Sequence, residues 1–373
     1  MSEKLTLIIP TKDRSDFLRR ALRYYSQVSC QFTLLICDSS NDAELERNIS
    51  TIAEYKESLK INHLFSSSNK RNTRSSSGWQ DDELLSGVMD NVVTPYVAFF
   101  ADDDFAIVKN ISIGIDFLET NNDYSYVCGT ALILTLSDDA VVGNLESVGL
   151  YSQRGVCLYS AKDRLTNLLS NYSVLEYGVS RTKQMRYRWR NVFDAKIDNL
   201  SAELLNCSLV AIQGKAKKLN ELLLVRQGHN RMNSRTGRDA FDWISEVFFK
   251  KSYGILHGIL AKELAAKENI DVREASEIVK QAFWAHIAKG LNRRYEHQYG
   301  KKNVIKLIRE FLRTVPWVKR LVNIVRGIKA VMLARKGELS LPALLNTSSP
   351  YHKDFMPVYK VVTSFEENLA KER

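Results

Sequence analysis

Thr94-Pro-Tyr-Val-Ala-Phe-Phe-Ala-Asp-Asp-Asp-Phe105 is the stretch around which this chain is organised. Its unbroken aromatic and apolar run, Tyr96 to Ala101, predicts a short strand that is buried on both faces. The carboxylates that follow, Asp102, Asp103 and Asp104, repel one another unless a cation or hydrogen-bond donors neutralise them, and Mg²⁺ or Mn²⁺ suits such oxygen ligands. Because alternate side chains of an extended segment share a face, we expect Asp102 and Asp104 to point together. The alternative is a solvated acidic turn.

The composition is that of a globular protein with acidic partners. Of the 373 residues, 45% are hydrophobic and 26% are charged, and the length predicts two or three domains. The formal net charge of +10 favours nucleotide phosphates, nucleic acid or anionic lipid as partners. The five cysteines are scattered without a Cys-x-x-Cys pair, which indicates buried free thiols in a reducing compartment. We find no signal-peptide pattern and no apolar stretch of transmembrane length, so we expect a cytoplasmic protein.

Strand-like and helix-like segments alternate before the carboxylates. The strand-like runs are Leu5–Ile9, Phe32–Cys37 and Ile61–Phe65, and helical periodicity lies between them. This order is typical of an α/β domain with a mostly parallel sheet, in which ligands bind beyond the carboxyl ends of the strands. Polar clusters fall at four such ends, namely Pro10–Arg14, Asp38–Asp42, Asn69–Arg74 and Asp102–Asp104. Neither Gly-x-Gly-x-x-Gly nor a P-loop occurs, which argues against a Rossmann dinucleotide enzyme and a P-loop enzyme.

Three motifs in this order resemble the family-two glycosyltransferases of the GT-A fold. They are Ile8-Ile-Pro-Thr-Lys-Asp-Arg14, Cys37-Asp-Ser-Ser-Asn-Asp42 and Phe100-Ala-Asp-Asp-Asp-Phe105, and the resemblance covers about the first 130 residues. It implies a GT-A domain followed here by a helical C-terminal region, and an inverting enzyme that uses a nucleotide sugar and a divalent metal. The chain departs from the family pattern at Ser39-Ser40, where Asp-Gly-Ser is more common.

The resemblance also implies roles for individual residues. The donor-binding set is Pro10, Thr11, Arg14, Asp38, Asn69, Arg71, Asp102 and Asp103, in which Pro10, Thr11 and Asp38 would contact the base and ribose. The metal set, for Mn²⁺ or Mg²⁺, is Asp102, Asp104 and His229, with Asp104 as the first candidate. Asp38 as a plain turn residue and Arg71 as a solvated loop cation are the alternatives.

An inverting transfer needs a carboxylate that deprotonates the acceptor hydroxyl. The family places it at a helix start, and here Asp198 is the first choice, with Asp194 and Glu203 next. Asp198 as an ordinary helix N-cap is the alternative. The segment Arg181–Arg190 alternates cations with aromatic residues, which indicates either an acceptor-binding stretch or a solvated basic face.

The C-terminal third has helical periodicity. We assign residues 1–235 to the GT-A domain, with the acceptor part at about 124–235, and 236–373 to a helical, basic region. Residues 304–335 are amphipathic and rich in Lys and Arg, which favours an anionic membrane surface; docked helices or an oligomer contact are the alternatives. Nucleic acid fits less well, because aromatic residues are not interleaved with these cations.

The sequence therefore predicts an inverting glycosyltransferase. It would move a sugar from a nucleotide sugar, a UDP-sugar first, to a hydroxyl of a glycan or lipid-linked acceptor in surface polysaccharide synthesis. Its place would be the cytoplasm, peripherally at the inner face of the membrane. The alternatives are a nucleotidyltransferase or a nucleotide-sugar-binding module without turnover, since both use similar α/β domains with carboxylates at strand ends.

Overall fold

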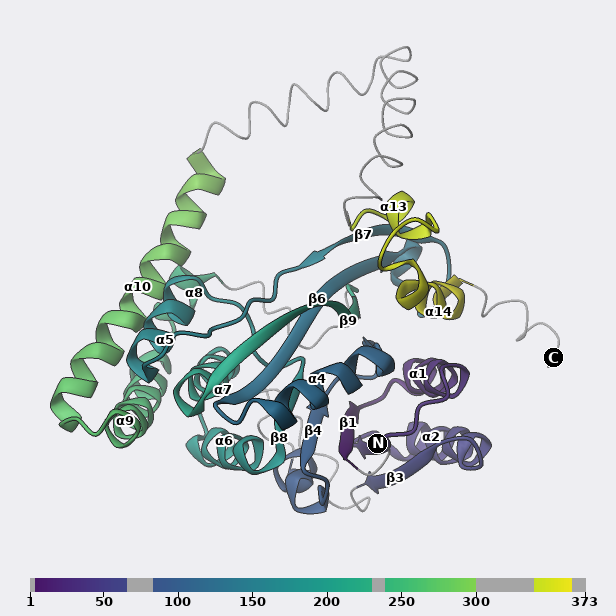
Figure 1. Ribbon diagram of the computed structural model, residues 1–373, viewed down its shortest axis with the longest axis horizontal. Coiled ribbons are helices and arrows are strands. Elements are labelled where there is room, and N and C mark those ends of the chain that lie inside the picture. Colours follow the sequence, from purple (N-terminus) through teal and green to yellow (C-terminus); the bar gives the residue numbers. More distant parts are fainter. Residues whose placement is uncertain (1–3, 66–82, 230–238, 300–338, 364–373) are drawn as a thin grey trace, which may run out of the picture.

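A mixed, mostly parallel sheet runs through the centre of the protein (Figure 1). The computed structural model describes residues 4–65, 83–229, 239–299 and 339–363. Within these residues the sheet has nine strands in the order β3-β2-β1-β4-β8-β6-β9-β5, and β7 pairs with β6. The predicted α/β class is confirmed.

The N-terminal half of the sheet is parallel, as predicted. Its strands are β1 (Leu5–Thr11), β2 (Thr33–Asp38), β3 (Lys60–Phe65) and β4 (Tyr96–Phe99), and its helices are α1 (Ser15–Gln27), α2 (Asp42–Tyr55), α3 (Glu83–Gly87) and the short 3₁₀ helix η3 (Val88–Asn91). Residues Thr11, Asp38 and Phe65 are aligned across β1, β2 and β3, so the three carboxyl ends form one edge.

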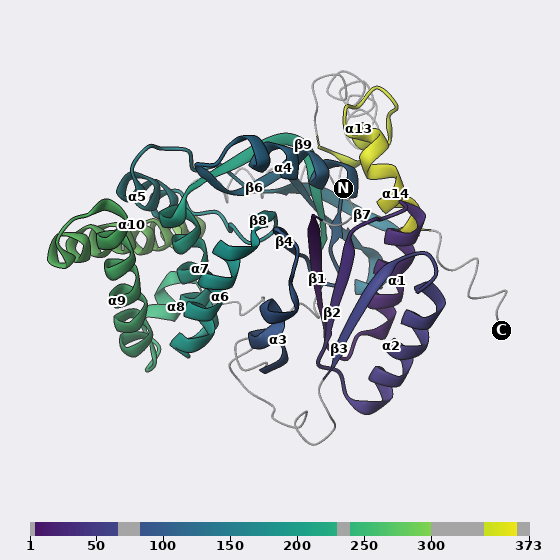
Figure 2. The same cartoon turned by 60° about the horizontal axis from the view of Figure 1, so that its bottom comes forward.

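The alternation of side chains along β1 explains why both faces of this half are covered. Leu7 packs in the hydrophobic cluster that contains α1, whereas Ile8 packs on the other face with Met185 and Trp189 of α6 (Thr182–Ala195). Figure 2 shows α1 and α2 on one side of these strands and α3 with α6 on the other.

The second half of the sheet changes strand direction at β8. The remaining strands are β5 (Phe105–Ala106), β6 (Tyr124–Leu136), β7 (Leu145–Tyr151), β8 (Val179–Arg181) and β9 (Lys215–Gln227). The short strand β8 is antiparallel to both β4 and β6, while β6 and β9 pair in parallel along their length. Joining them are α4 (Val108–Thr120), the 3₁₀ turn η4 (Ser137–Asp139), α5 (Ala161–Ser170), α6 and α7 (Asn199–Gln213).

A second hydrophobic cluster joins the predicted acceptor part to the C-terminal helices. It combines α5 and α7 with α8 (Ala240–Ile244), α9 (Phe249–Glu268) and α10 (Val272–Tyr299). The predicted boundary at residue 235 lies outside the described residues. The helices that follow share a core with α5 and α7, because each of these helices needs a partner for its apolar face.

The end of the chain returns to the first core. Helices α13 (Leu341–Leu345) and α14 (His352–Thr363) lie near α1 in both ribbon views (Figures 1 and 2). Phe355 and Val358 are buried in the cluster that contains α1, and Asn110 Nδ2 donates to Asp354 Oδ2 over 2.7 Å. The amphipathic segment 304–335 lies outside the described residues. Among the helices that are described, none is long and apolar enough to cross a membrane.

Most of Arg181–Arg190 lies in α6, where Lys183 and Arg190 are exposed, as the solvated basic face predicts, but other side chains of the segment are buried. Arg188 and Trp189 of α6 are only 2% and 1% exposed. Arg188 Nη2 donates to Ser180 Oγ over 3.0 Å, and Arg181 Nη2 donates to the carbonyl oxygen of Leu118 over 2.6 Å. These cations hold backbone and polar groups of neighbouring elements together, which the periodicity of one segment does not reveal.

The five cysteines are free, as predicted, but they are not all buried. Cys157 is exposed, whereas Cys30, Cys37, Cys128 and Cys207 are buried.

Candidate functional site

The turns after β1 and β2 are joined to each other at the carboxyl edge of the sheet. Asp13 takes a left-handed φ of 54°, a conformation that aspartate tolerates better than most residues. Its Oδ1 accepts a hydrogen bond from the backbone N–H of Asn41 over 2.8 Å, and its own N–H donates to Ser40 Oγ over 2.9 Å. Pro10 and Thr11 therefore end β1 beside a braced turn, in register with Cys37 and Asp38.

Asp38 is fully buried and has neutral or weakly charged partners. Its carboxylate accepts hydrogen bonds from Ser40 N over 3.0 Å and from Asn48 Nδ2 over 2.8 Å, and His63 Nε2 lies 3.2 Å from Oδ2. Burial acts to raise the pKa of Asp38, but the hydrogen bonds from His63, Ser40 and Asn48 outweigh it and lower that pKa. A cavity of about 580 Å³ opens beside these residues, between α2 and β3, with His63 and Phe65 in its wall.

The three consecutive carboxylates form a turn, which corrects the prediction that Asp102 and Asp104 share a face. The N–H of Asp104 donates to the carbonyl oxygen of Ala101, so the segment is not extended and side chains do not alternate. Asp102 and Asp103 share the guanidinium of Arg14 instead. Thr11 Oγ1 also donates to Asp102 Oδ2 over 2.7 Å. The acidic-turn interpretation fails too, because all three carboxylates are at most 4% exposed.

Asp104 has a partner from β9 that the sequence did not indicate. Phe105 pairs with Val225 in the antiparallel β5–β9 ladder, which places Arg226 opposite Asp104. Arg226 Nε donates to the two carboxylate oxygens of Asp104 over 3.3 and 3.1 Å. The Arg226 guanidinium also lies 4.2 Å from the ring centre of Tyr177 and 4.9 Å from that of Tyr151.

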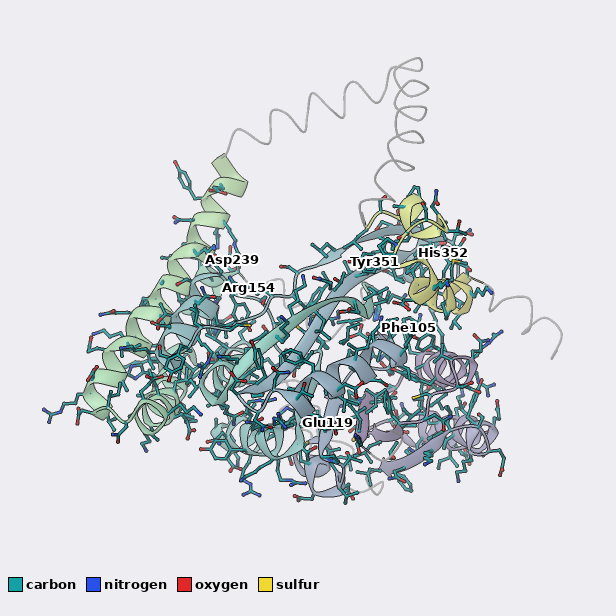
Figure 3. The ribbon with its side chains drawn as sticks, viewed as in Figure 1. Phe105, Glu119, Arg154, Asp239, Tyr351 and His352 are labelled. Carbon is teal, nitrogen blue, oxygen red and sulfur yellow. The ribbon has the colours of Figure 1, made fainter. Side chains whose placement is uncertain are left out.

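His229 lies beside Asp103, at the end of β9. Its Nε2 is 2.8 Å from Asp103 Oδ2, and its ring stacks on Phe17 of α1 at 4.8 Å. The structure thus brings the predicted His229 into the carboxylate cluster. Phe105, which directly follows the cluster and is labelled in Figure 3, is fully buried, with the Arg20 guanidinium 4.8 Å from its ring centre.

Burial and the arginines act in opposite directions on the cluster. Burial raises the pKa values of Asp102 and Asp104, against the charges of Arg14 and Arg226. For Asp103, burial is outweighed by His229 and Arg14, so its pKa is lowered. Asp103 Oδ1 is buried and accepts no hydrogen bond from the described residues. The charge of the buried Arg20 also acts on Asp102 and Asp103, so three arginines act on the three carboxylates and the unpartnered oxygen of Asp103 is what distinguishes the cluster.

The donor set suits a divalent ion that also binds phosphate. In the described part of the chain, no three Asp, Glu, His or Cys side chains form a preformed metal cage. Mg²⁺ and related ions commonly take one or two carboxylates and complete their shell with water and substrate phosphates. The buried, unpartnered oxygen of Asp103 beside two further carboxylates fits that pattern.

Glu176 is a site residue that sequence reasoning missed. Because β8 is antiparallel to β4 and Val179 pairs with Ala98, the residues just before β8 lie at the carboxyl end of β4, next to the carboxylates. Gly178 allows the chain before β8 to pack closely against β6, since a Cβ at this position would come within 2.3 Å of the Val127 carbonyl oxygen. Glu176 is half-buried, its carboxylate has no hydrogen-bond partner among the described residues, and burial raises its pKa to about 7. Only the pairing of β8 with β4 could have revealed it.

The three predicted base candidates differ in their surroundings. Asp198 is the N-cap of α7, and its carboxylate accepts hydrogen bonds from Leu200 N and Ser201 N, both over 3.1 Å. Asp194 is exposed near the end of α6. Glu203 is half-buried and accepts a hydrogen bond from Tyr172 Oη over 2.8 Å. Burial raises the pKa of Glu203, and the positive charge of Arg226 acts to lower it. The structure gives Asp198 the N-cap role and brings only Glu203 toward the carboxylate cluster.

Two predicted donor contacts, Asn69 and Arg71, lie outside the described residues. The other donor and metal candidates meet at one edge of the sheet: Pro10, Thr11, Arg14, Asp38, Asp102, Asp103, Asp104 and His229.

Comparison with known proteins shows which fold this edge belongs to. No protein-family model and no curated protein matches the chain. Among solved structures, the chain is similar to S. aureus TarS 1-349 in complex with UDP-GlcNAc, with 12% identity, a TM-score of 0.50, and coverage of 98% of this chain and 92% of that one.

Two further structures give lower scores. A longer structure of S. aureus TarS has 11% identity and a TM-score of 0.48, with 85% of this chain covered, and this chain spans half of its length. Glucosyl-3-phosphoglycerate synthase from Mycobacterium tuberculosis in complex with Mn²⁺, UDP and glucosyl-3-phosphoglycerate has 12% identity and a TM-score of 0.35, with coverage of 72% of this chain and 81% of that one. The likeness to TarS 1-349 shows the fold: this chain is a GT-A-type α/β domain followed by a helical C-terminal region.

Proposed function

We propose that this protein is a glycosyltransferase that takes its sugar from a nucleotide sugar. One observation carries the proposal: two groups of side chains meet at the carboxyl edge of a GT-A-type sheet. The first is a buried aspartate at the end of β2, and the second is a carboxylate cluster with two arginines at the end of β4. A UDP-sugar is the first donor, because the solved structure of similar fold, TarS 1-349, holds UDP-GlcNAc.

The two ends of this edge would bind different parts of the donor. Asp38 has a lowered pKa and is ionised at neutral pH. Because it is fully buried against Ser40, Asn48 and His63, a ribose hydroxyl would bind it by replacing one of these partners. The cavity beside His63 and Phe65 offers rings for the base. Arg14 is 14% exposed and carries the planar donors that suit a diphosphate, and Arg226 pairs with Asp104 of the same cluster. Asn69 and Arg71 stay predicted contacts to the base or diphosphate.

Mn²⁺ or Mg²⁺ is the proposed metal, held by Asp102, Asp103 and Asp104 with His229 beside Asp103. When bound, such an ion neutralises charge on the departing nucleoside diphosphate. The chain's own arginines would offset part of the same charge, because Arg14 contacts Asp103 and Arg226 contacts Asp104. His229, stacked on Phe17, would hold Asp103 in place.

Glu176 is the carboxylate that we propose as the general base of an inverting transfer. A base works best with a pKa near the working pH, and that of Glu176 is about 7. Its carboxylate has no hydrogen-bond partner among the described residues, so it is available to accept a proton from the acceptor hydroxyl. Glu203, which is also raised in pKa by burial, is the second candidate.

The wider role follows the resemblance in sequence. The acceptor would be a glycan or a lipid-linked glycan in surface polysaccharide synthesis, at the inner face of the cytoplasmic membrane. We assign donor binding and catalysis to residues 1–235 and a supporting role to the helices after 236, which share a core with α5 and α7.

One assay tests the proposal. The protein is incubated with a panel of nucleotide sugars and Mn²⁺, and released nucleoside diphosphate is measured. Release of UDP or another nucleoside diphosphate supports sugar transfer or donor hydrolysis, whereas pyrophosphate release would indicate a nucleotidyltransferase. Binding of nucleotide sugar without release of either product would indicate a binding module.

A further inference from the structure

A second cavity lies where the acceptor part of the sheet domain meets the C-terminal helices. It measures about 630 Å³, within the range of small-molecule sites. Its walls come from Tyr172 after α5, from Leu200 and Glu203 on α7, from Trp243 on α8, and from His286 on α10. Asp239, labelled in Figure 3 near α10, lies at its rim on the α8 side.

Aromatic rings dominate one side of this cavity. The Tyr172 and His286 rings meet edge to face at 5.0 Å, and burial lowers the pKa of His286, which keeps its ring neutral. Trp243 packs against Phe249 and is 4% exposed, yet its Nε1–H has no acceptor among the described residues. This nitrogen is itself buried, so Trp243 gives the cavity wall apolar ring surface and no accessible donor.

Three carboxylates and two arginines line the cavity. Arg294 Nη1 contacts Asp239 Oδ1 over 2.9 Å and Asp242 Oδ1 over 3.2 Å. Glu203 accepts a hydrogen bond from Tyr172, and Arg293 is exposed at the rim without a partner among the described residues. Because the carboxylates outnumber the arginines, the cavity does not favour a phosphate or a carboxylate ligand.

Glu203 connects this cavity to the candidate catalytic edge. Its side chain lines the cavity, and the charge of Arg226 acts on it. Arg226 in turn pairs with Asp104. A ligand in the cavity would therefore contact a carboxylate that also interacts with the candidate catalytic edge.

We propose that this cavity binds a neutral sugar ring, a unit of the acceptor glycan next to the one that receives the new sugar. A sugar has apolar C–H faces that suit the rings of Trp243 and Tyr172, and hydroxyls that can donate to Glu203. The inference rests on the proposed glycosyl transfer, since only that function requires a second carbohydrate site.

A cavity-filling variant tests the site. Leu200→Trp puts an indole into the cavity from the first turn of α7, and Ile259→Trp adds the same bulk to a half-buried position of the same hydrophobic cluster outside the cavity wall. The probes are the methyl glycosides of glucose, galactose and N-acetylglucosamine, followed by saturation-transfer difference NMR with the full chain. At least one glycoside should bind, and Leu200→Trp should weaken it by about tenfold or more while Ile259→Trp does not.

A second pair of variants identifies the class of ligand. Arg293→Ala and Arg273→Ala each remove an exposed cation from α10, but only Arg293 lines the cavity. A neutral sugar should lose less than about threefold in affinity with either variant. If inorganic phosphate binds instead and only Arg293→Ala abolishes its binding, the site takes an anion and the sugar proposal is overturned.

UDP binding separates failure of this inference from failure of the proposed function. UDP affinity, measured by calorimetry with Mn²⁺, should be equal in the wild type and Leu200→Trp. If UDP binds but no glycoside gives a Leu200-dependent signal, the cavity inference fails and the proposed function stands. If a glycoside binds at the cavity but neither UDP nor any nucleotide sugar binds, the carbohydrate site stands as a binding site and the transferase proposal fails.

Discussion

The two ends of the candidate edge bury aspartates in opposite ways. At the end of β2, Asp38 is surrounded by short-range donors from its own turn and from α2 and β3, and its pKa is lowered. At the end of β4, Asp102 and Asp104 are buried against distant arginines, and their pKa values are raised. Glu176 lies at this second end, also with a raised pKa.

This difference separates binding from chemistry. A carboxylate that is already satisfied and ionised is suited to hold a ligand in one geometry. Carboxylates whose pKa is raised by burial, because their partners do not fully offset the cost of desolvation, can gain or lose a proton or an ion when a substrate binds. We therefore expect changes near β4 and β8 to affect turnover and changes near β2 to affect donor affinity.

The largest effect is expected from Glu176→Gln. Loss of the general base should reduce sugar transfer by about 10²- to 10⁴-fold while UDP affinity is unchanged. Initial rates of UDP release with and without an acceptor measure this, and Glu146→Gln, an exposed glutamate on β7, is the matched control. Normal transfer by Glu176→Gln, together with an inactive Glu203→Gln, would assign the base to Glu203.

Asp104→Asn should reduce turnover by about 10²- to 10³-fold, the usual cost of losing a group that stabilises transition-state charge. The amide keeps an oxygen acceptor for Arg226, so the fold should be retained. Thermal shift measures the second consequence, since the stabilisation that UDP gives in the presence of Mn²⁺ should be lost. Asp116→Asn, on the exposed face of α4, is the control; unchanged Mn²⁺-dependent stabilisation of Asp104→Asn would remove Asp104 from the metal site.

Asp38→Asn sharpens the comparison at the other end. It should weaken UDP binding by about tenfold, because one charged hydrogen-bond acceptor for the donor is lost, with little change in turnover at saturating donor. Calorimetry with UDP, and separate kcat and KM values, measure the two effects. A fall in kcat as large as that of Asp104→Asn would show that the β2 end contributes to turnover as well as to donor binding.

The two ends should also respond oppositely to pH. The raised pKa of Glu176 contributes stability at low pH that is lost as pH rises from the ordinary glutamate value to about 7, roughly 1 to 3 kcal/mol. The lowered pKa of Asp38 contributes stability at neutral pH that is lost as pH falls below the ordinary aspartate value. Urea unfolding across pH tests both, because Glu176→Gln should reduce the loss at rising pH, to which Asp102 and Asp104 also contribute, and leave the loss at falling pH unchanged.

The smallest effect is expected from Asp198, which lies at neither end. Asp198→Ala removes the N-cap of α7 and should lower the free energy of unfolding by about 0.5 to 2 kcal/mol with sugar transfer unchanged. Asp198→Asn keeps a capping side chain and should restore the stability. Loss of transfer in both variants at full stability would return Asp198 to the role of base.

Local patterns in the sequence determined the first half of the fold. The apolar runs at β1, β2, β3 and β4 and the turn residues after them were sufficient to predict a parallel sheet with polar side chains at its carboxyl edge. Asp38, Asp102, Asp103, Asp104 and Arg14 were found in this way because each follows directly from a strand that its own sequence specifies.

Only the tertiary structure decided the partners of these residues. Arg226 faces Asp104 through the pairing of β5 with β9, and Glu176 reaches the same edge through the antiparallel pairing of β8 with β4. The prediction for Asp102 and Asp104 failed because the hydrogen bond from Asp104 to Ala101 closes a turn where an extended segment was assumed. Periodicity specifies which face of an element is buried, but strand pairing between segments 80 to 120 residues apart depends on the packing of the whole chain.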